Sequence, residues 1–107
     1  MVDQALDLDA TFQALAHPVR RAILSRLTEE RDATVTALAE PFEMSLAGIS
    51  KHLRVLQSAG LVQVEPHGRE RHVRLDPGPL AAAEDWIEQH RRFWTERLDA
   101  RDDLLRG

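Results

Sequence analysis

Apolar residues recur at spacings of three and four along the first part of the chain, the pattern of helices with one buried face: Phe12, Leu15, Ala16, Val19, Ile23, Leu24 and Leu27. The sequence His17-Pro18 interrupts this pattern, because the residue before a proline avoids helical angles while proline suits the first turn of a helix. We therefore expect two helices, over 8–16 and 18–29, followed by a polar connection.

A short third helix is expected after this connection. Thr36 can accept a hydrogen bond from a free backbone N–H and so cap a helix over 37–42. Pro41 limits that helix to little more than a turn or two. A tight turn then leads to Ser45, which caps a fourth helix.

A hairpin and a long helix are predicted behind the fourth helix. Gly60 ends the fourth helix, because glycine accepts a positive φ. Alternating apolar and polar residues over 61–75 predict a β-hairpin with a basic, glycine-containing tip. The segment 79–106 contains no glycine and no proline after Pro79, and we expect it to form one long helix. The expected fold is mainly α with a small β-hairpin, in the order α-α-α-α-β-β-α, as a single domain over 1–107.

The composition and the motif content exclude several functional classes. A chain without cysteine forms no disulfide, no thiolate metal site and no thiol nucleophile. No motif of nucleophilic catalysis is present, so we assign no catalytic residue and expect no enzymatic activity. The acidic N-terminus is unlike a signal peptide, and apolar runs long enough to span a membrane are missing. We expect a soluble, cytoplasmic protein that does not associate with membranes.

The distribution of charge points to a polyanionic partner, although the formal net charge is −4. Residues 45–74 carry five basic and two acidic residues, while the segments before and after are acidic. The basic residues of this segment are Lys51, Arg54, Arg69, Arg71 and Arg74. Such asymmetry in a small domain predicts a basic face flanked by acidic surface, as nucleic-acid-binding proteins have.

The fourth helix has two opposite faces when its residues are placed at about 100° intervals. One arc of roughly 80° is apolar and is expected to be in the core: Leu46, Ile49, Leu53 and Leu56. The other side carries small residues and two cations: Ala47, Gly48, Lys51, Arg54, Val55 and Ser58. Small residues allow close approach and cations indicate a negative partner, so this helix is expected to enter a groove of DNA. A hydroxyl at Ser45, beside free backbone N–H groups, suits a phosphate oxygen. Each of these features of the fourth helix, taken alone, has a second explanation, which is an ordinary solvated surface without a binding partner.

A short helix, a three-residue turn and a second amphipathic helix form a helix-turn-helix, whose second helix lies in the major groove. Three stretches, ALAHPVRRAILSRL, TVTALAEPFEMSLAGISKHLRVLQSAGLV and GRERHVRLDP, resemble the ArsR-type winged helix-turn-helix transcriptional regulators over about residues 11–98. The resemblance is most specific at Ser50-Lys51-His52-Leu53. It implies a homodimeric repressor on a partly palindromic operator in double-stranded DNA, with a recognition helix over 45–60 and a wing over 61–75.

The residues expected to contact DNA lie on the recognition helix and the wing: Ser45, Ala47, Gly48, Ser50, Lys51, His52, Arg54, Arg69 and Arg71. His52 lies at the border of the two helix faces, where it could donate to a phosphate or satisfy a backbone carbonyl. His17, beside a proline, is expected to be a turn or cap residue rather than a ligand.

The metal sites of the family cannot be transferred to this chain. The third helix offers only Glu40, and His90 on the last helix lacks the spaced carboxylates of the family site. We therefore expect no metal and no cofactor, and the sequence does not identify a small-molecule effector. A zinc site formed by Glu84, Glu88 and His90 with a second subunit is the alternative to a solvated acidic face with one interface histidine.

The last helix carries a broad apolar stripe, which indicates contact with more than one surface. Together with the first helix it is expected to form a two-fold dimer interface from Leu8, Phe12, Leu15, Trp86, Ile87, His90, Phe93, Trp94 and Leu98. The alternative for each tryptophan is a core position, which we expect for one of them. A two-fold axis would set two recognition helices about 34 Å apart, one turn of DNA.

The sequence therefore predicts a sequence-specific DNA-binding repressor. Two other functions stay open at this point. One is a winged-helix module that binds an acidic protein, and the other is a metal-responsive repressor with a site unlike those of the family.

Overall fold

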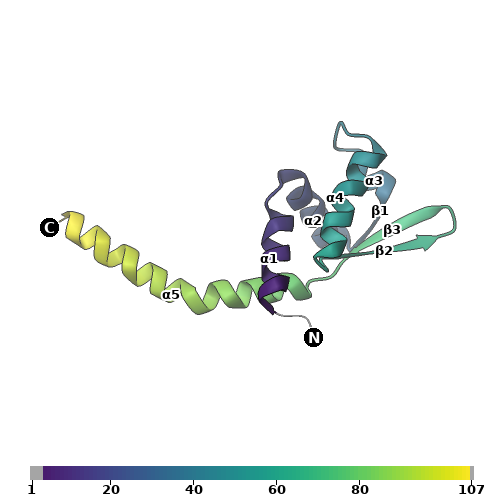
Figure 1. The fold of residues 1–107 in the computed structure, drawn as a ribbon. Helices are drawn as coiled ribbons and strands as arrows, with labels where there is room; N and C mark the ends of the chain where they lie inside the picture. The colour runs from purple at the N-terminus through teal and green to yellow at the C-terminus, as the bar shows by residue number, and fades with distance from the viewer. Residues whose placement is uncertain (1–3, 107) are drawn as a thin grey trace.

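The computed structural model describes the backbone of residues 4–106 and the side chains of residues 8–99. Figure 1 shows a group of short helices beside a small sheet, with one long helix extending away from them. In chain order the elements are α1 (Gln4–Leu15), α2 (Pro18–Glu30), β1 (Asp32–Thr34), α3 (Val35–Ala39), α4 (Leu46–Ser58), β2 (Val62–His67), β3 (Glu70–Leu75) and α5 (Gly78–Arg106). The expected class, mainly α with a β-hairpin and a winged helix-turn-helix, is confirmed.

The core lies where α2, α3 and α4 meet the sheet. Its buried residues are aliphatic: Ala14, Ile23, Leu24, Leu27, Ala33, Val35, Leu38, Ala39, Ile49, Leu53, Leu56, Leu61, Val62 and Val73. The long helix α5 packs against α1 and contributes few residues to this core. Within the described part of the chain, no helix is both long and apolar enough to cross a membrane.

The junction between α1 and α2 is held by side chains at its polar backbone groups. The His17 Nδ1 accepts from the backbone N–H of Val19 at 3.1 Å and caps α2, which is the role expected for this histidine. Arg20 and Arg21 donate to carbonyls at the C-terminal end of α1. Positive charges are also stabilised there by the negative end of the helix dipole. α1 begins four residues earlier than expected, since the stretch before residue 8 contains no proline or glycine that would stop a helix.

The sheet contains a strand in addition to the predicted hairpin, and this strand, β1, is the main feature that the sequence pattern did not predict. These three residues lie in the expected polar connection, but they pair antiparallel with β3 and give the sheet order β1-β3-β2. Ala33 lies opposite Val73 and is buried, whereas a single alternation over three residues is too short to predict a strand. The strand exists because β3 supplies its hydrogen-bonding partner.

The cap of α3 is also different from the prediction. The Thr34 Oγ1, and not that of Thr36, accepts from the backbone N–H of Ala37 at 3.1 Å. The helix therefore covers Val35–Ala39 rather than 37–42 and ends before Pro41. Because the cap residue must itself be extended, the end of β1 places Thr34 in the right conformation (φ −76°, ψ 156°).

The recognition helix and the hairpin follow each other closely. Gly60 has a φ of +76° directly after α4, as expected for a glycine that ends a helix. In the hairpin, Val64 pairs with Val73, so the faces of β2 and β3 that carry these valines point to the same side. Gly68, with a φ of +64°, forms the turn between the strands.

Two adjacent positions on α4 should differ sharply in their effect on stability. Leu56 is fully buried, so Leu56→Ala should lower the free energy of unfolding by about 2–5 kcal/mol. Val55 is 39% exposed, and Val55→Ala should cost less than about 1 kcal/mol. Urea unfolding followed by circular dichroism measures both, and equal losses would contradict the burial of this face of α4.

Candidate nucleic-acid interface

The recognition helix α4 begins with the expected serine cap. The Ser45 Oγ accepts from the backbone N–H of Gly48 at 3.1 Å. Because the oxygen acts as acceptor, the hydroxyl proton stays free to donate to another group. Ser45 is exposed, so that group can come from a bound partner.

The apolar face of α4 is shorter than the helical wheel suggested. Ile49, Leu53 and Leu56 are buried, but Leu46 is 53% exposed. Leu46 is the first residue of the helix, where the chain turns away from the core, so the wheel position alone does not bury it. An exposed leucine, together with the partly exposed Met44, therefore lies at the N-terminal end of the recognition helix.

Gly48 lies against the side chain of Met44. A Cβ at this position would lie 3.1 Å from the Met44 Cε, which is tighter than ordinary contact. The methionine side chain thus covers the glycine. A Cβ at Gly48 would meet the flexible end of an exposed methionine, and the role of Gly48 in the close approach of DNA stays a prediction.

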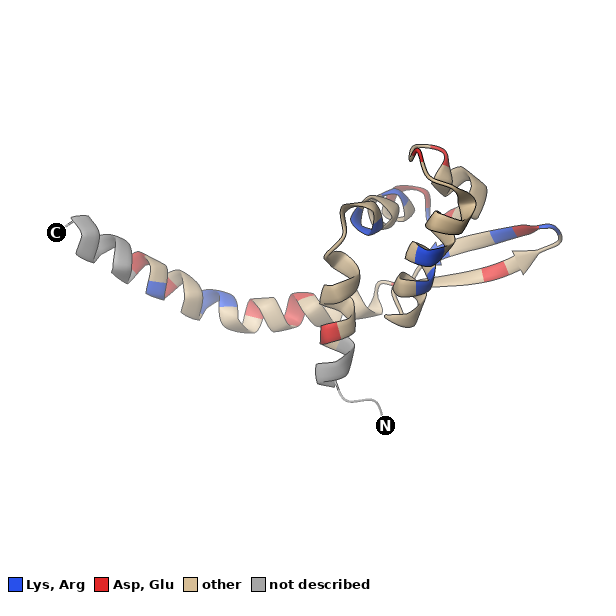
Figure 2. Cartoon of the chain, turned by 45° about the horizontal axis from the view of Figure 1, so that its top comes forward, with Lys and Arg blue, Asp and Glu red and all other residues tan. Residues whose placement is uncertain are grey.

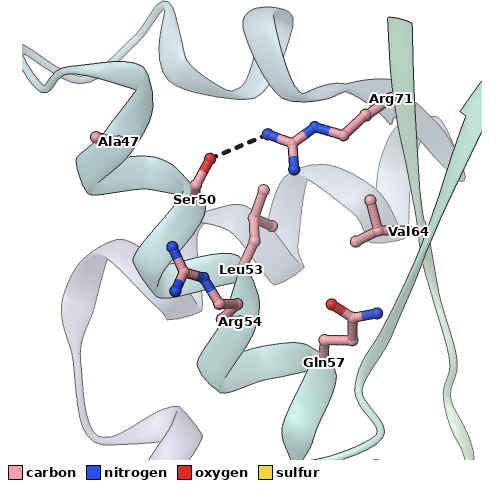
Figure 3. A pocket seen from close by; sticks show the side chains of 7 residues that line it. All are labelled: Ala47, Ser50, Leu53, Arg54, Gln57, Val64 and Arg71. Carbon is pink, nitrogen blue, oxygen red and sulfur yellow. Dashed lines mark hydrogen bonds between the residues drawn. The ribbon is translucent and has the colours of Figure 1, made fainter.

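The exposed side of α4 and the hairpin enclose a cleft of about 340 Å³. Its lining combines residues of α4 with residues of β2 and β3: Ala47, Ser50, Leu53, Arg54, Gln57, Val64 and Arg71. The structure thus brings four of the predicted DNA-contact residues together around one space (Figure 3). Gln57 is an addition to the prediction, and its spacing from Ser50 and Arg54 already placed it on the same helix face.

The wing arginine Arg71 is tied to the recognition helix. Its Nη2 donates to the Ser50 Oγ at 3.1 Å, across the space between β3 and α4 (Figure 3). Arg69 lies in the exposed turn of the hairpin and, together with Arg71, lines a second groove beside Leu46 and the start of α3. Arg71 therefore borders both spaces, whereas Arg69 does not line the cleft beside α4.

Arg74 lies close to two acidic side chains, one in the hairpin and one in β1. This arginine lies 3.4 Å from a carboxylate oxygen of Glu65 and 3.7 Å from one of Asp32. Asp32 also accepts from the His72 Nδ1 at 2.8 Å. The register places these residues on the sheet face opposite Val64 and Val73, so their charges balance each other away from α4.

The other four cations of the basic segment are not neutralised in this way. Among the residues whose side chains the structure describes, no ion pair is recorded for Lys51, Arg54, Arg69 or Arg71. Figure 2 shows basic residues on α4, and toward the end of the hairpin it shows basic residues with an acidic one between them, while the turn before α4 is acidic. Cations without a recorded ion pair thus lie on both α4 and the hairpin.

His52 points toward α2. Arg20 Nη1 lies 3.4 Å from the His52 Nδ1, and the His52 ring lies 4.4 Å from the ring of His17 between centroids. Since arginine only donates, this Nδ1 must be the unprotonated acceptor, and the proton is on Nε2. Burial lowers the pKa of His52, and the neighbouring His17 and Arg20 lower it further. The ring is thus kept neutral and links the recognition helix to α2.

Most of the residues predicted for the dimer interface form an exposed, largely aromatic surface on α1 and α5. The Phe12 and Trp86 rings meet edge to face with centroids 6.1 Å apart, and His90 lies between Trp86 and Trp94 at 4.6 and 5.8 Å. Trp86 and Trp94 are 37% and 42% exposed, so neither is the core residue that we expected one of them to be.

The remaining members of this surface differ in exposure. Leu8 is half-buried, and Leu15 is partly buried against the core. Ile87 is 40%, Phe93 54% and Leu98 65% exposed, so the stripe becomes more accessible along α5.

The alternative zinc site finds no support within one chain. The His90 Nδ1 donates to the Trp86 carbonyl at 2.8 Å, and Glu88 is paired with Arg91. In the part of the chain that the structure describes, no three histidine or carboxylate side chains are grouped to hold a metal.

Comparisons with known proteins identify the family. Residues 15–65 match the model of a helix-turn-helix domain family. The HTH-type transcriptional regulator Rv2034 of Mycobacterium tuberculosis is 40% identical over 97 residues, which is 91% of this chain and 87% of that protein. The arsenical resistance operon repressor of Escherichia coli is 32% identical over 83% of this chain and 76% of its own length.

Solved structures agree with this result. The crystal structure of an ArsR family transcriptional regulator superposes with a TM-score of 0.80 and 37% identity, covering 89% of this chain and 97% of the other. The chain belongs to the ArsR family of transcriptional regulators. An ArsR-like regulator from Rhodococcus sp. RHA1, with a TM-score of 0.73 and 31% identity, covers 96% of both chains. As an ArsR-family protein, the chain is a DNA-binding transcriptional regulator and not an enzyme, and both predictions are confirmed.

The neutral state of His52 predicts a pH dependence of stability for this ArsR-family protein. The unfolded chain takes up a proton on this histidine near pH 6.5, whereas the folded chain resists protonation. The unfolded state then binds more protons, so the free energy of unfolding should decrease as the pH falls below about 6.5. In His52→Gln this part of the decrease should be absent.

A nuclear magnetic resonance titration of the histidine C2 protons measures the cause directly. The signal that is missing in His52→Gln should titrate at lower pH than a free histidine does. A signal that titrates at the ordinary pH would contradict the burial of His52 against α2.

Proposed function

We propose that this protein is a homodimeric repressor that binds a partly palindromic operator near a promoter through α4 and the hairpin. The observation that carries the proposal is the face formed by Lys51, Arg54 and Arg71. Its cations have no recorded acidic partner among the described side chains, while Arg74 on the opposite sheet face is neutralised. A surface that leaves cations unpaired on one helix and its wing is suited to a phosphate backbone.

The two ends of α4 suggest different contacts. Residues at the N-terminal end of a recognition helix contact base edges, and here Ala47 and Leu46 are exposed together with the Ser45 hydroxyl. Apolar side chains at this end suit the methyl group of thymine in the major groove. Lys51 and Arg54, one and two turns further on, are suited to phosphates or guanine edges.

The aromatic surface on α1 and α5 supports a homodimer. Residues 86, 87, 90, 93, 94 and 98 fall within about 140° of the α5 surface at 100° per residue, and most of this arc is exposed in a single chain. Aromatic residues are enriched at protein interfaces and carry much of their binding energy. A second copy is the partner that would bury the same surface on both subunits, as a two-fold axis requires.

An acidic protein is the second candidate for the basic face. An acidic protein would have to present several carboxylates to this face. The guanidinium groups and the hydroxyl beside the α4 cleft are also the groups that bind phosphate, which every nucleotide of DNA carries. A metal response has less support, because the side chains of His90 and Glu88 already have partners within the chain. We therefore favour DNA as the partner of this face.

Removal of cations from α4 should weaken DNA binding through loss of phosphate neutralisation. Lys51→Ala and Arg54→Ala should each lower the affinity for a duplex from immediately upstream of the coding sequence. A contact to phosphate alone should also reduce the slope of log affinity against log salt by about one unit. Fluorescence anisotropy of the labelled duplex at several salt concentrations measures both quantities.

Arg92→Ala removes the same charge from α5 and is the matched control. It should leave both the affinity and the salt slope near the wild-type values. Equal effects of all three substitutions would show that net charge, and not the face of α4, governs binding.

A charge within the aromatic surface should prevent dimerisation. Trp94→Glu should shift the protein to monomers in analytical ultracentrifugation and weaken operator binding, because two half-sites can no longer be held together. Thr95→Glu introduces the same charge at the next residue, on the polar side of α5, and should stay dimeric. A wild-type protein that is monomeric at all concentrations would contradict the proposal.

A further inference from the structure

The cleft between the recognition helix and the wing has the chemistry of an anion site. Its polar lining residues are Ser50, Arg54, Gln57 and Arg71, and none of its seven lining residues is acidic. Leu53 and Val64 form its apolar part, and Leu53 is buried. Charged hydrogen bonds are stronger beside such apolar surface than in open water.

Ser50 holds Arg71 in this cleft. The arginine uses one N–H on the Ser50 Oγ, at 3.1 Å, and a guanidinium has five such donors. The serine accepts this bond and keeps its own proton for a further acceptor. Figure 3 shows the Arg71 side chain extending from β3 toward α4 instead of continuing outward with the hairpin.

We propose that this cleft binds one phosphate of the DNA backbone, where a strand passes between α4 and the hairpin. Arg71 and Arg54 pair with the phosphate oxygens, Gln57 donates from its amide, and Ser50 is a positioning residue that orients Arg71. The inference rests on the proposed DNA-binding function and assigns one phosphate within it. Two arginines approaching from the helix and the wing match the several acceptor oxygens of a phosphate.

A backbone phosphate fits better than a free anion because of where the cleft lies. Ala47, Ser50 and Arg54 line it from the exposed side of α4, the same side on which Lys51 is exposed. A duplex that follows this helix must carry its backbone past the cleft. The wing then acts together with the helix through Arg71, while Arg69 in the turn does not line the cleft.

The test combines protein variants with a duplex that lacks a single charge. An operator duplex is selected from a random library with the wild-type protein, and each phosphate of one half-site is replaced in turn by a neutral methylphosphonate. Arg71→Ala should weaken binding to the unmodified duplex by about tenfold or more. At one methylphosphonate position, wild type and Arg71→Ala should bind equally, because the charge that the arginine contacts is gone.

Ser50 gives a second readout that a structural role alone would not produce. Ser50→Ala should weaken binding and leave the salt slope unchanged, because the charge of Arg71 is still present. Its effect should vanish at the same methylphosphonate position. Ser50→Thr keeps the hydroxyl and should restore most of the affinity, and Arg69→Ala should show no such dependence on that position.

The possible failures are distinguishable. If the wild-type protein selects no duplex, the proposed DNA-binding function is wrong. If it binds DNA tightly but no methylphosphonate position removes the effect of Arg71→Ala, the phosphate site is wrong while DNA binding stands. If inorganic phosphate competes for wild type but not for Arg71→Ala, and no backbone position matters, the cleft binds a free anion, which also overturns the proposal.

Discussion

The burial of one face of α4 is the constraint on which the rest of the structure depends. Ile49, Leu53 and Leu56 are fixed in the core shared with α2, α3 and the sheet. Because these three residues cannot rotate out of the core, the opposite side of the helix must face solvent. Lys51 and Arg54 are thereby presented outward by a rigid support, which is a better basis for binding a duplex than a mobile loop.

The same burial brings the hairpin to the recognition helix. Gly60 turns the chain directly after α4, and Leu61 and Val62 enter the core behind it. The side of the hairpin that carries Val64 then faces α4, and Arg71 comes within hydrogen-bonding distance of Ser50. A sheet residue and a helix residue that lie 21 positions apart thus act on one space.

Opposite charges are separated by the two faces of the sheet. Successive side chains along a strand point to opposite sides, so Arg74 and Glu65 pair on the outer face while Arg71 faces the helix. This arrangement explains how a chain with a net charge of −4 can bind DNA. Glu65 of the hairpin is paired with Arg74 on the outer face, so this carboxylate does not oppose the basic face.

Local patterns in the sequence were sufficient for the helices, for the caps at His17 and Ser45, and for the hairpin, because each depends on neighbouring residues. They were insufficient for β1, whose pairing partner lies about 40 residues away, and for the cap of α3, which depends on that strand. The basic character of residues 45–74 could be read from composition, but which cations stay unpaired could not. Three contacts could be seen only in the tertiary structure: the ion pairs of Arg74, the contact of His52 with α2, and the hydrogen bond from Arg71 to Ser50. Each joins elements that are far apart in the sequence and meet only when the chain folds.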